Sequence, residues 1–113
     1  MKTEDLEGAA LDYWVAKAGG SAIVTEVFGL TEDELTFGLW VECGGSDCYS
    51  PSTRWEYGGP IIEAEKIILV PKMNEWRAAD WKALPKVREF IGSTPLIAAM
   101  RCVVASKFGD EVE

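Results

Sequence analysis

The stretch that decides the fold is STPLIAAMRCVVASKFG, residues 93–109. Ser93 or Thr94 can cap a helix at this point, Pro95 suits the first helical position, and Gly109 ends the helix. The side chains between them are apolar nearly all the way round. A helix with so wide an apolar surface is either deeply buried or part of a subunit interface, so in a small chain it also predicts a homo-oligomer.

A second helix is predicted at the other end of the chain, from Thr3 to Ala18. Thr3 can cap this helix, acidic side chains fill its first turn, where the helix dipole favours negative charge, and two glycines follow it. Apolar side chains recur along one face at helical spacing. Tyr13 and Trp14 belong to that face, and we expect both to pack in the core.

The segment after this helix has the pattern of a β-hairpin. Ser21 to Phe28 is rich in β-branched residues, and Leu35 to Cys43 alternates between two faces, with Trp40 on the face opposite Leu35. Alternation of this kind is typical of a half-buried strand. The two runs therefore predict paired strands, followed by a turn at residues 44–47.

A further strand is predicted from Ala64 to Val70, ended by Pro71. Residues 74–90 fit either a short helix or a strand followed by a loop, because Pro85 interrupts them. The order of helix, strands and helix predicts an α+β fold, in which a small antiparallel β-sheet is covered by an N-terminal and a C-terminal helix. We expect a single domain over residues 1–113.

Composition excludes several classes of partner. The chain has 113 residues, of which 48% are hydrophobic, and 19 acidic against 11 basic residues give a net charge of -8. This balance opposes binding to nucleic acid and to an anionic membrane surface, and a DNA-mimicking face is disfavoured because the carboxylates alternate with Lys and Arg. The longest strongly apolar run falls far short of the roughly 20 residues of a membrane helix. The N-terminus is acidic and not apolar, which predicts a cytoplasmic location rather than export.

The absence of histidine narrows the chemistry. Catalysis by Ser-His-Asp or Cys-His is excluded, and the three cysteines Cys43, Cys48 and Cys102 are too few for a zinc site. We expect them to be reduced thiols, and we expect no metal and no cofactor. Acid–base chemistry would have to use Asp, Glu, Lys, Tyr or Cys, which lowers the expectation of an enzyme.

The segment 49–63 is the candidate binding site. Its aromatic side chains can stack on a base, its hydroxyls can bond a ribose or phosphate, its arginine suits an anion, and its two glycines allow close approach of a ligand. Two prolines and two glycines argue against a regular helix here. An arginine on the final helix either joins the site or pairs with a carboxylate. The predicted ligand-binding residues are Tyr49, Ser50, Ser52, Thr53, Arg54, Trp55, Tyr57, Gly58, Gly59 and Arg101.

A purely structural interpretation of the same segment stays open. The Ser-Pro-Ser-Thr run is typical of a turn with hydroxyl-to-backbone bonds, Gly-Gly-Pro of a chain reversal, and the aromatics of a core. Only Glu56 and Glu63 offer a general base in this segment, and no acid–base pair is identifiable. The segment is therefore better suited to holding a ligand than to transforming it, and we assign no catalytic residue.

Three strings carry a resemblance to a known family. They are Tyr49-Ser50-Pro51-Ser52-Thr53 with Trp55 and Gly58-Gly59-Pro60-Ile61-Ile62-Glu63, then Thr94 to Gly109, and the opening Gly8 to Ala18. These strings resemble the phage NinX-like family, and they follow one another along the chain in the same order as in that family. The resemblance implies a small phage or prophage accessory protein and no particular biochemical activity.

Two functional hypotheses follow. The first is a non-enzymatic binder that sequesters a nucleotide-type small molecule, such as a host immune signal, and so counters host defence. The alternative is a protein–protein interaction module that binds a host or phage protein through the same segment or an acidic face. An enzyme acting on nucleotides through a glutamate or tyrosine is the third and weakest reading.

Overall fold

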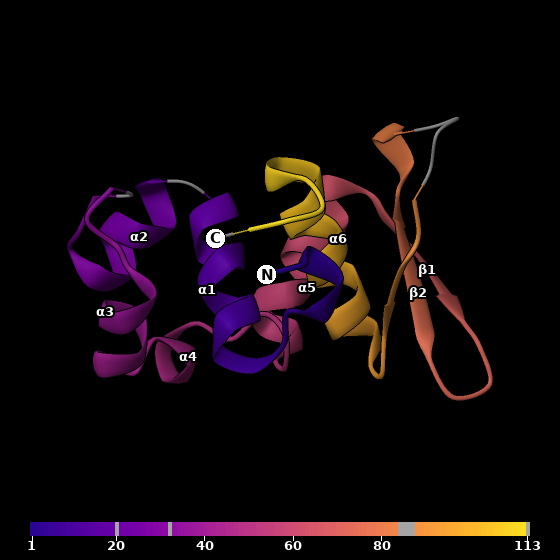
Figure 1. Cartoon of the computed structure of the whole chain (residues 1–113), viewed down its shortest axis with the longest axis horizontal. Coiled ribbons are helices and arrows are strands. Elements are labelled where there is room, and N and C mark those ends of the chain that lie inside the picture. The colour runs from indigo at the N-terminus through magenta and orange to yellow at the C-terminus, as the bar shows by residue number, and fades with distance from the viewer. Residues whose placement is uncertain (20, 32, 84–87, 113) are drawn as a thin grey trace.

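Helix α6 (Pro95–Phe108) runs through the middle of the protein in the computed structural model, which describes residues 1–19, 21–31, 33–83 and 88–112 (Figure 1). The Thr94 hydroxyl caps it by accepting a hydrogen bond from the Ile97 amide at 3.1 Å, as the sequence predicts. Half of its 14 residues are buried by other parts of the same chain. Burial within the chain explains the wide apolar surface of α6, so the homo-oligomer stays a prediction that the fold does not require.

One face of α6 lies against a three-stranded antiparallel sheet. The strands are β1 (Ile67–Pro71), β2 (Trp76–Asp80) and β3 (Phe90–Gly92), in the order β1-β2-β3. Packing of β3 on α6 is close, because a Cβ atom at Gly92 would lie 2.5 Å from the Ala98 amide nitrogen. The fold class is therefore α+β, as predicted, with helices packed against a small antiparallel sheet.

The strand predictions for this half of the chain are largely confirmed. The strand expected at residues 64–70 begins three residues later, because helix α5 (Trp55–Glu65) occupies its start and Lys66 ends that helix in a left-handed conformation with φ 55°. Of the two alternatives for residues 74–90, the strand is found at Trp76–Asp80; a short 3-10 helix follows at Trp81–Ala83, and β3 begins at Phe90. The position of Pro85 lies outside the described residues.

Helix α1 (Gly8–Ala18) packs against α6 on the side away from the sheet (Figure 1). It begins later than predicted, because a 3-10 turn at Thr3–Asp5 precedes it, and Thr3 does not cap it. The Thr3 hydroxyl instead donates to the Gly109 carbonyl at 2.7 Å. Tyr13 is buried and Trp14 packs partly buried against the same core, as predicted.

The predicted hairpin is wrong. Residues 21–48 form three short helices: α2 (Ser21–Phe28), α3 (Phe37–Glu42) and α4 (Gly45–Cys48). The Thr36 hydroxyl caps α3 by accepting from the Leu39 amide at 3.2 Å. Trp40, predicted on the polar face of a strand, is fully buried, whereas Phe37 and Val41 are exposed. Burial of the largest side chain outweighs the few tenths of a kcal/mol by which strand and helix propensities differ at each residue.

The prediction that residues 49–63 contain no regular helix is also wrong for the second half of the segment. Helix α5 runs straight through Gly58, Gly59 and Pro60. A proline inside a helix removes one backbone hydrogen bond and costs about 3 kcal/mol, so tertiary packing must hold the helix together. That packing comes from Tyr57 and two isoleucines, which lie partly buried against the core. Residues 49–54 do form a turn, closed by hydrogen bonds to the Ser50 carbonyl.

The two ends of the described chain lie side by side (Figure 1). The Met1 ammonium group donates to the Val112 carbonyl at 2.8 Å, and the Val112 amide returns a bond to the Met1 carbonyl at 2.9 Å. Arg88 adds a clamp by pairing with both Asp110 and Glu4.

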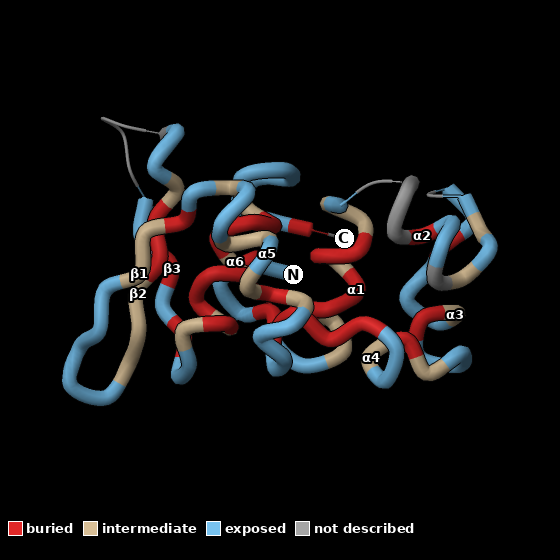
Figure 2. The backbone as a smooth tube through the Cα atoms, turned by 180° about the vertical axis from the view of Figure 1, so that it is seen from behind, coloured by how far each residue is buried: buried red, intermediate tan, exposed pale blue. Residues whose placement is uncertain are grey.

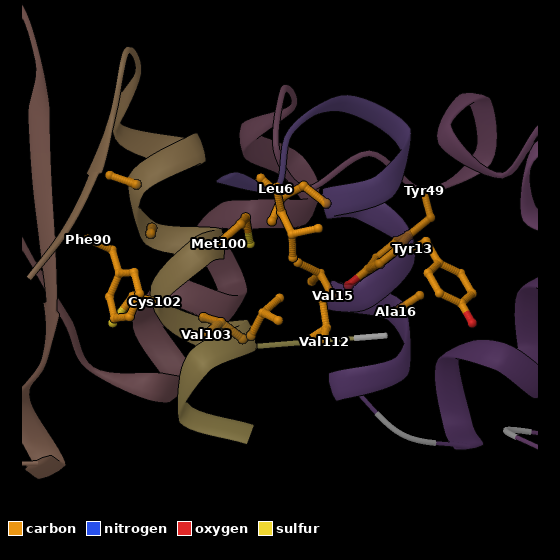
Figure 3. Close-up of a cluster of buried hydrophobic side chains, with 14 of the residues drawn as sticks. Leu6, Tyr13, Val15, Ala16, Tyr49, Phe90, Met100, Cys102, Val103 and Val112 are labelled. Carbon is orange, nitrogen blue, oxygen red and sulfur yellow. The ribbon is translucent and has the colours of Figure 1, made fainter. Parts of the chain in front are cut away.

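Buried side chains form one cluster that extends from Leu35 and Trp40 to Phe90 on the sheet. Figure 2 shows the buried residues concentrated along α1 and α6, and Figure 3 shows side chains from both helices meeting between them. No helix in the described part of the chain combines the length and the apolar character needed to cross a membrane.

Candidate ligand-binding site

The fold divides the predicted site into a buried layer and an exposed layer. Tyr49, Ser50, Ser52 and Gly58 are buried, so most of their surface is already occupied by the protein. The exposed layer presents its side chains to solvent at the turn before α5 and consists of Thr53, Arg54 and Trp55.

An open hollow of about 350 Å³ lies between the turn before α5 and the start of α6. Ser52, Thr53 and Trp55 line it from the first side, and Thr94 to Ile97 line it from the second. This volume falls within the range of about 300 to 1,000 Å³ that small-molecule sites occupy. Three residues of the predicted site therefore share one hollow with the N-terminal turn of the central helix.

We call this the outer hollow. The polar groups around it make few hydrogen bonds within the protein. The Ser52 hydroxyl is buried and has no hydrogen-bond partner among the described residues. The Thr53 hydroxyl makes a long bond of 3.4 Å to the Ser50 carbonyl. Arg54, beside the hollow in sequence, is half exposed and lies 3.8 Å from the Glu56 carboxylate, which is a weak surface pair. A ligand could compete for all three groups at small cost.

Asp12 is a functional candidate that the sequence analysis missed. Its side chain is buried, and its two carboxylate oxygens accept from the Ser52 amide at 3.0 Å and the Ser46 hydroxyl at 2.9 Å. The Trp40 indole N–H in turn donates to Ser46 at 3.3 Å. Asp12 thereby fixes the turn at residue 52 against α1. The sequence feature that could have identified Asp12 is its carboxylate within the otherwise apolar run from Leu11 to Ala16.

Tyr49 belongs to the core rather than to the exposed layer. Its ring meets Tyr57 edge-on at 5.4 Å and Trp40 at 6.5 Å. Burial, and secondarily the negative charge of Asp12, raises the pKa of Tyr49 to about 12. The phenol therefore keeps its proton at neutral pH, yet its hydroxyl has no hydrogen-bond partner among the described residues.

The glycines and Arg101 have structural surroundings. A Cβ atom at Gly58 would lie 2.5 Å from the Leu96 side chain, so the space beside Gly58 is filled by α6. At Gly59 the nearest such neighbour, in Trp55, would be 3.8 Å away. Arg101 donates to the Leu6 carbonyl at 2.7 Å and to the Ile91 carbonyl at 2.6 Å, and does not line the outer hollow. It bonds backbone carbonyls instead of the carboxylate that one reading predicted.

A family model described as "Bacteriophage P22, NinX" matches residues 2–107. The chain belongs to the NinX family. Among curated proteins none matches the chain. The match includes α1, the segment 49–63 and all but the last residue of α6, and the residues that line the outer hollow all lie within it. Family membership identifies this NinX protein as a phage protein and by itself assigns no activity.

The cysteines of the NinX protein lie apart from the outer hollow. Cys43 and Cys48 are exposed and Cys102 is buried, and all three are free thiols. Burial chiefly raises the pKa of Cys102 to about 12, so its thiol keeps its proton at neutral pH. Within residues 1–19, 21–31, 33–83 and 88–112, no three acidic or sulfur ligands gather where a metal ion could bind.

Proposed function

We propose that this phage protein is a non-enzymatic binder that sequesters a nucleotide-type small molecule in the host cell cytoplasm, and thereby blunts a host immune signal. The observation that carries the proposal is the outer hollow of about 350 Å³ beside Trp55. The Trp55 side chain is 54% exposed although it is among the largest apolar groups of the chain. An indole held at the rim of a hollow is suited to stacking on a base.

The groups around the hollow match the remaining parts of such a ligand. Hydroxyls from Ser52 and Thr53 can bond a ribose or a phosphate, and the Arg54 guanidinium can pair with a phosphate. The N-terminal end of α6 borders the same hollow and favours negative charge. A local anion site is compatible with an acidic protein, because charges beyond about 10 Å are screened at ordinary salt.

Binding without turnover is the second part of the proposal. Glu56 and Glu63, the carboxylates of the segment, are exposed to solvent and do not line the outer hollow. Tyr49 and Cys102 both keep their protons, because burial raises their pKa values to about 12. We therefore expect the ligand to leave the protein unchanged.

Calorimetry with cyclic nucleotides and ADP-ribose derivatives tests both parts. Replacing Trp55 by alanine should weaken binding roughly 5- to 150-fold, since stacking of one base on an aromatic side chain contributes about 1–3 kcal/mol. Trp81→Ala is the matched control, because Trp81 is 55% exposed and does not line the outer hollow. Equal loss in both variants, no binding of any of these ligands, or recovery of degraded ligand by chromatography would each contradict the proposal.

A second candidate function is a protein–protein interaction module. Phe37 and Val41 lie one turn apart on α3, and both are exposed large apolar side chains. Such a pair is a suitable anchor for a protein partner or for a second copy of this chain. A stoichiometric partner captured from host lysate, and lost with Val41→Ser, would favour this function, and light scattering would measure the predicted homo-oligomer.

A further inference from the structure

A second hollow of about 200 Å³ lies on a different part of the protein, where α1, α5 and α6 meet. Its apolar lining comes from Val15 and Ala18 of α1, Ile61 and Ala64 of α5, and Val103 of α6. It shares no lining residue with the outer hollow beside Trp55. We call it the inner hollow.

The Tyr49 hydroxyl is the polar group directed into this apolar space. Figure 3 shows the hydroxyl end of Tyr49 pointing toward Val15, on the side of α1 that faces α6. The Tyr49 side chain is only 6% exposed, and its oxygen has no partner among the described residues. A buried donor without a partner is costly, so the protein gains when another molecule supplies an acceptor.

Water is a poor occupant of the inner hollow. The hollow is open at Ala64, so water can enter it, but water gains little there because the one other polar side chain in the lining is Glu65. Glu65 is already paired with Lys82 at 2.6 Å. The lining therefore favours a molecule that is apolar over most of its surface and carries one acceptor.

Size and charge define the occupant further. An apolar cavity of about 150 Å³ accommodates benzene, so about 200 Å³ suits one ring or two fused rings. The C-terminal ends of α1 and α5 both reach the hollow, at Ala18 and Glu65, and helix C-termini disfavour anions. The inner hollow thus rejects the phosphate-bearing ligand for which the outer hollow is suited.

We propose that the inner hollow is a second binding site, which takes a neutral planar heteroaromatic molecule of one or two rings. The apolar faces of this molecule lie between Val15, Ile61 and Val103. The acceptor atom in its ring accepts a hydrogen bond from the Tyr49 hydroxyl. The site does not depend on the nucleotide-binding function proposed above.

Quinoline and naphthalene are matched probes, because they share one shape and quinoline alone has an acceptor nitrogen. Titrations followed by amide NMR should show saturable quinoline binding with shifts at Val15 and Val103, and naphthalene should bind roughly twofold to tenfold more weakly. Replacing Tyr49 by phenylalanine should abolish or reverse the preference for quinoline, because the quinoline nitrogen then has no donor in the hollow. Retained preference for quinoline in Tyr49→Phe, or shifts that map elsewhere in the unmodified protein, would overturn the proposal.

A plug in the hollow supplies a second test. Ala64 lines the inner hollow yet is exposed, so Ala64→Trp can fill the entrance without crowding the core. Glu63→Trp is the control, since Glu63 is the adjacent exposed residue of α5 and is absent from the lining. Quinoline binding should be lost in the first variant and kept in the second. Undiminished binding to Ala64→Trp would refute the site.

Discussion

Adjacent glycines in α5 provide a sharp test of how this helix packs. Gly58 and Gly59 both lie inside α5, where replacing glycine by alanine gains about 1 kcal/mol of helix propensity, but Gly59 also precedes Pro60, whose ring disfavours a Cβ atom on a helical residue before it. Their surroundings differ. A Cβ atom at Gly58 would lie 2.5 Å from the Leu96 side chain and 2.6 Å from the Pro51 carbonyl oxygen, whereas at Gly59 the nearest such atom is 3.8 Å away.

Overpacking of a well-filled site costs about 1–3 kcal/mol, and the Pro51 carbonyl belongs to the backbone and cannot rotate away. Gly58→Ala should therefore leave the free energy of unfolding about 1 kcal/mol lower than in the parent protein, once the propensity gain is subtracted. Gly59→Ala should leave the free energy of unfolding close to that of the parent protein, because the clash with the Pro60 ring offsets the propensity gain.

Urea denaturation with an unchanged slope measures both values, and a difference of about 1 kcal/mol between the variants should also separate their melting temperatures by roughly 4 °C. If both alanines change the free energy of unfolding to the same extent, α5 does not contact α6 through Gly58. Our account of why a helix tolerates the Gly-Gly-Pro string would then be wrong.

Three further predictions concern buried polar groups. Replacing Asp12 by alanine should cost about 3 kcal/mol of stability in chemical denaturation, because the Ser52 amide and the Ser46 hydroxyl both lose their carboxylate acceptor. Asp12→Asn should cost about 1 kcal/mol. Equal costs in the two variants would contradict the role of Asp12 in fixing the turn at Ser52. Ellman's reagent should react quickly with the two exposed cysteines and slowly with Cys102, whereas all three should react in urea. Burial raises the pKa of Tyr49 from 10 to about 12, so its contribution to the free energy of unfolding is fully present below pH 10 and is lost as the pH rises toward 12. Tyr49→Phe should lessen this alkaline loss of stability in a series of unfolding curves at different pH values.

Helix α6 and strand β1 were the most predictable parts of the fold. Helix α6 carries consistent signals at every level, with a threonine cap, a first-position proline and a glycine stop around an apolar run. Strand β1 was recognisable by its unbroken apolar sequence. Each of these elements satisfies its local preference and its tertiary environment at once.

The middle of the chain could not be predicted, because its local pattern and its packing disagree. The alternation from Leu35 to Cys43 matches a strand, but burial follows Leu35 and Trp40, five residues apart, which lie against Tyr13 and Phe28. A helix of only six residues supplies too short a window for its period to emerge. Contacts with residues more than twenty positions away settle the conformation there.

The candidate site was likewise predictable only in part. Residue types identified the segment 49–63, yet its exposed and buried layers depend on which side of the turn α6 covers. Asp12, which holds the turn in place, lies 40 residues before Ser52 in the sequence. A single sequence holds no pattern that pairs two such positions.

The paired chain ends have a consequence for folding entropy. Contacts between Met1 and Val112 close a loop of nearly the whole chain, and loop closure of this length costs about 4 kcal/mol by the logarithmic rule. A backbone joined head to tail through a short glycine linker would remove most of that cost from folding. Such a ring could then be opened at an exposed loop, such as residues 72–74 between β1 and β2, to give a permuted chain with the same core and new ends beside the sheet.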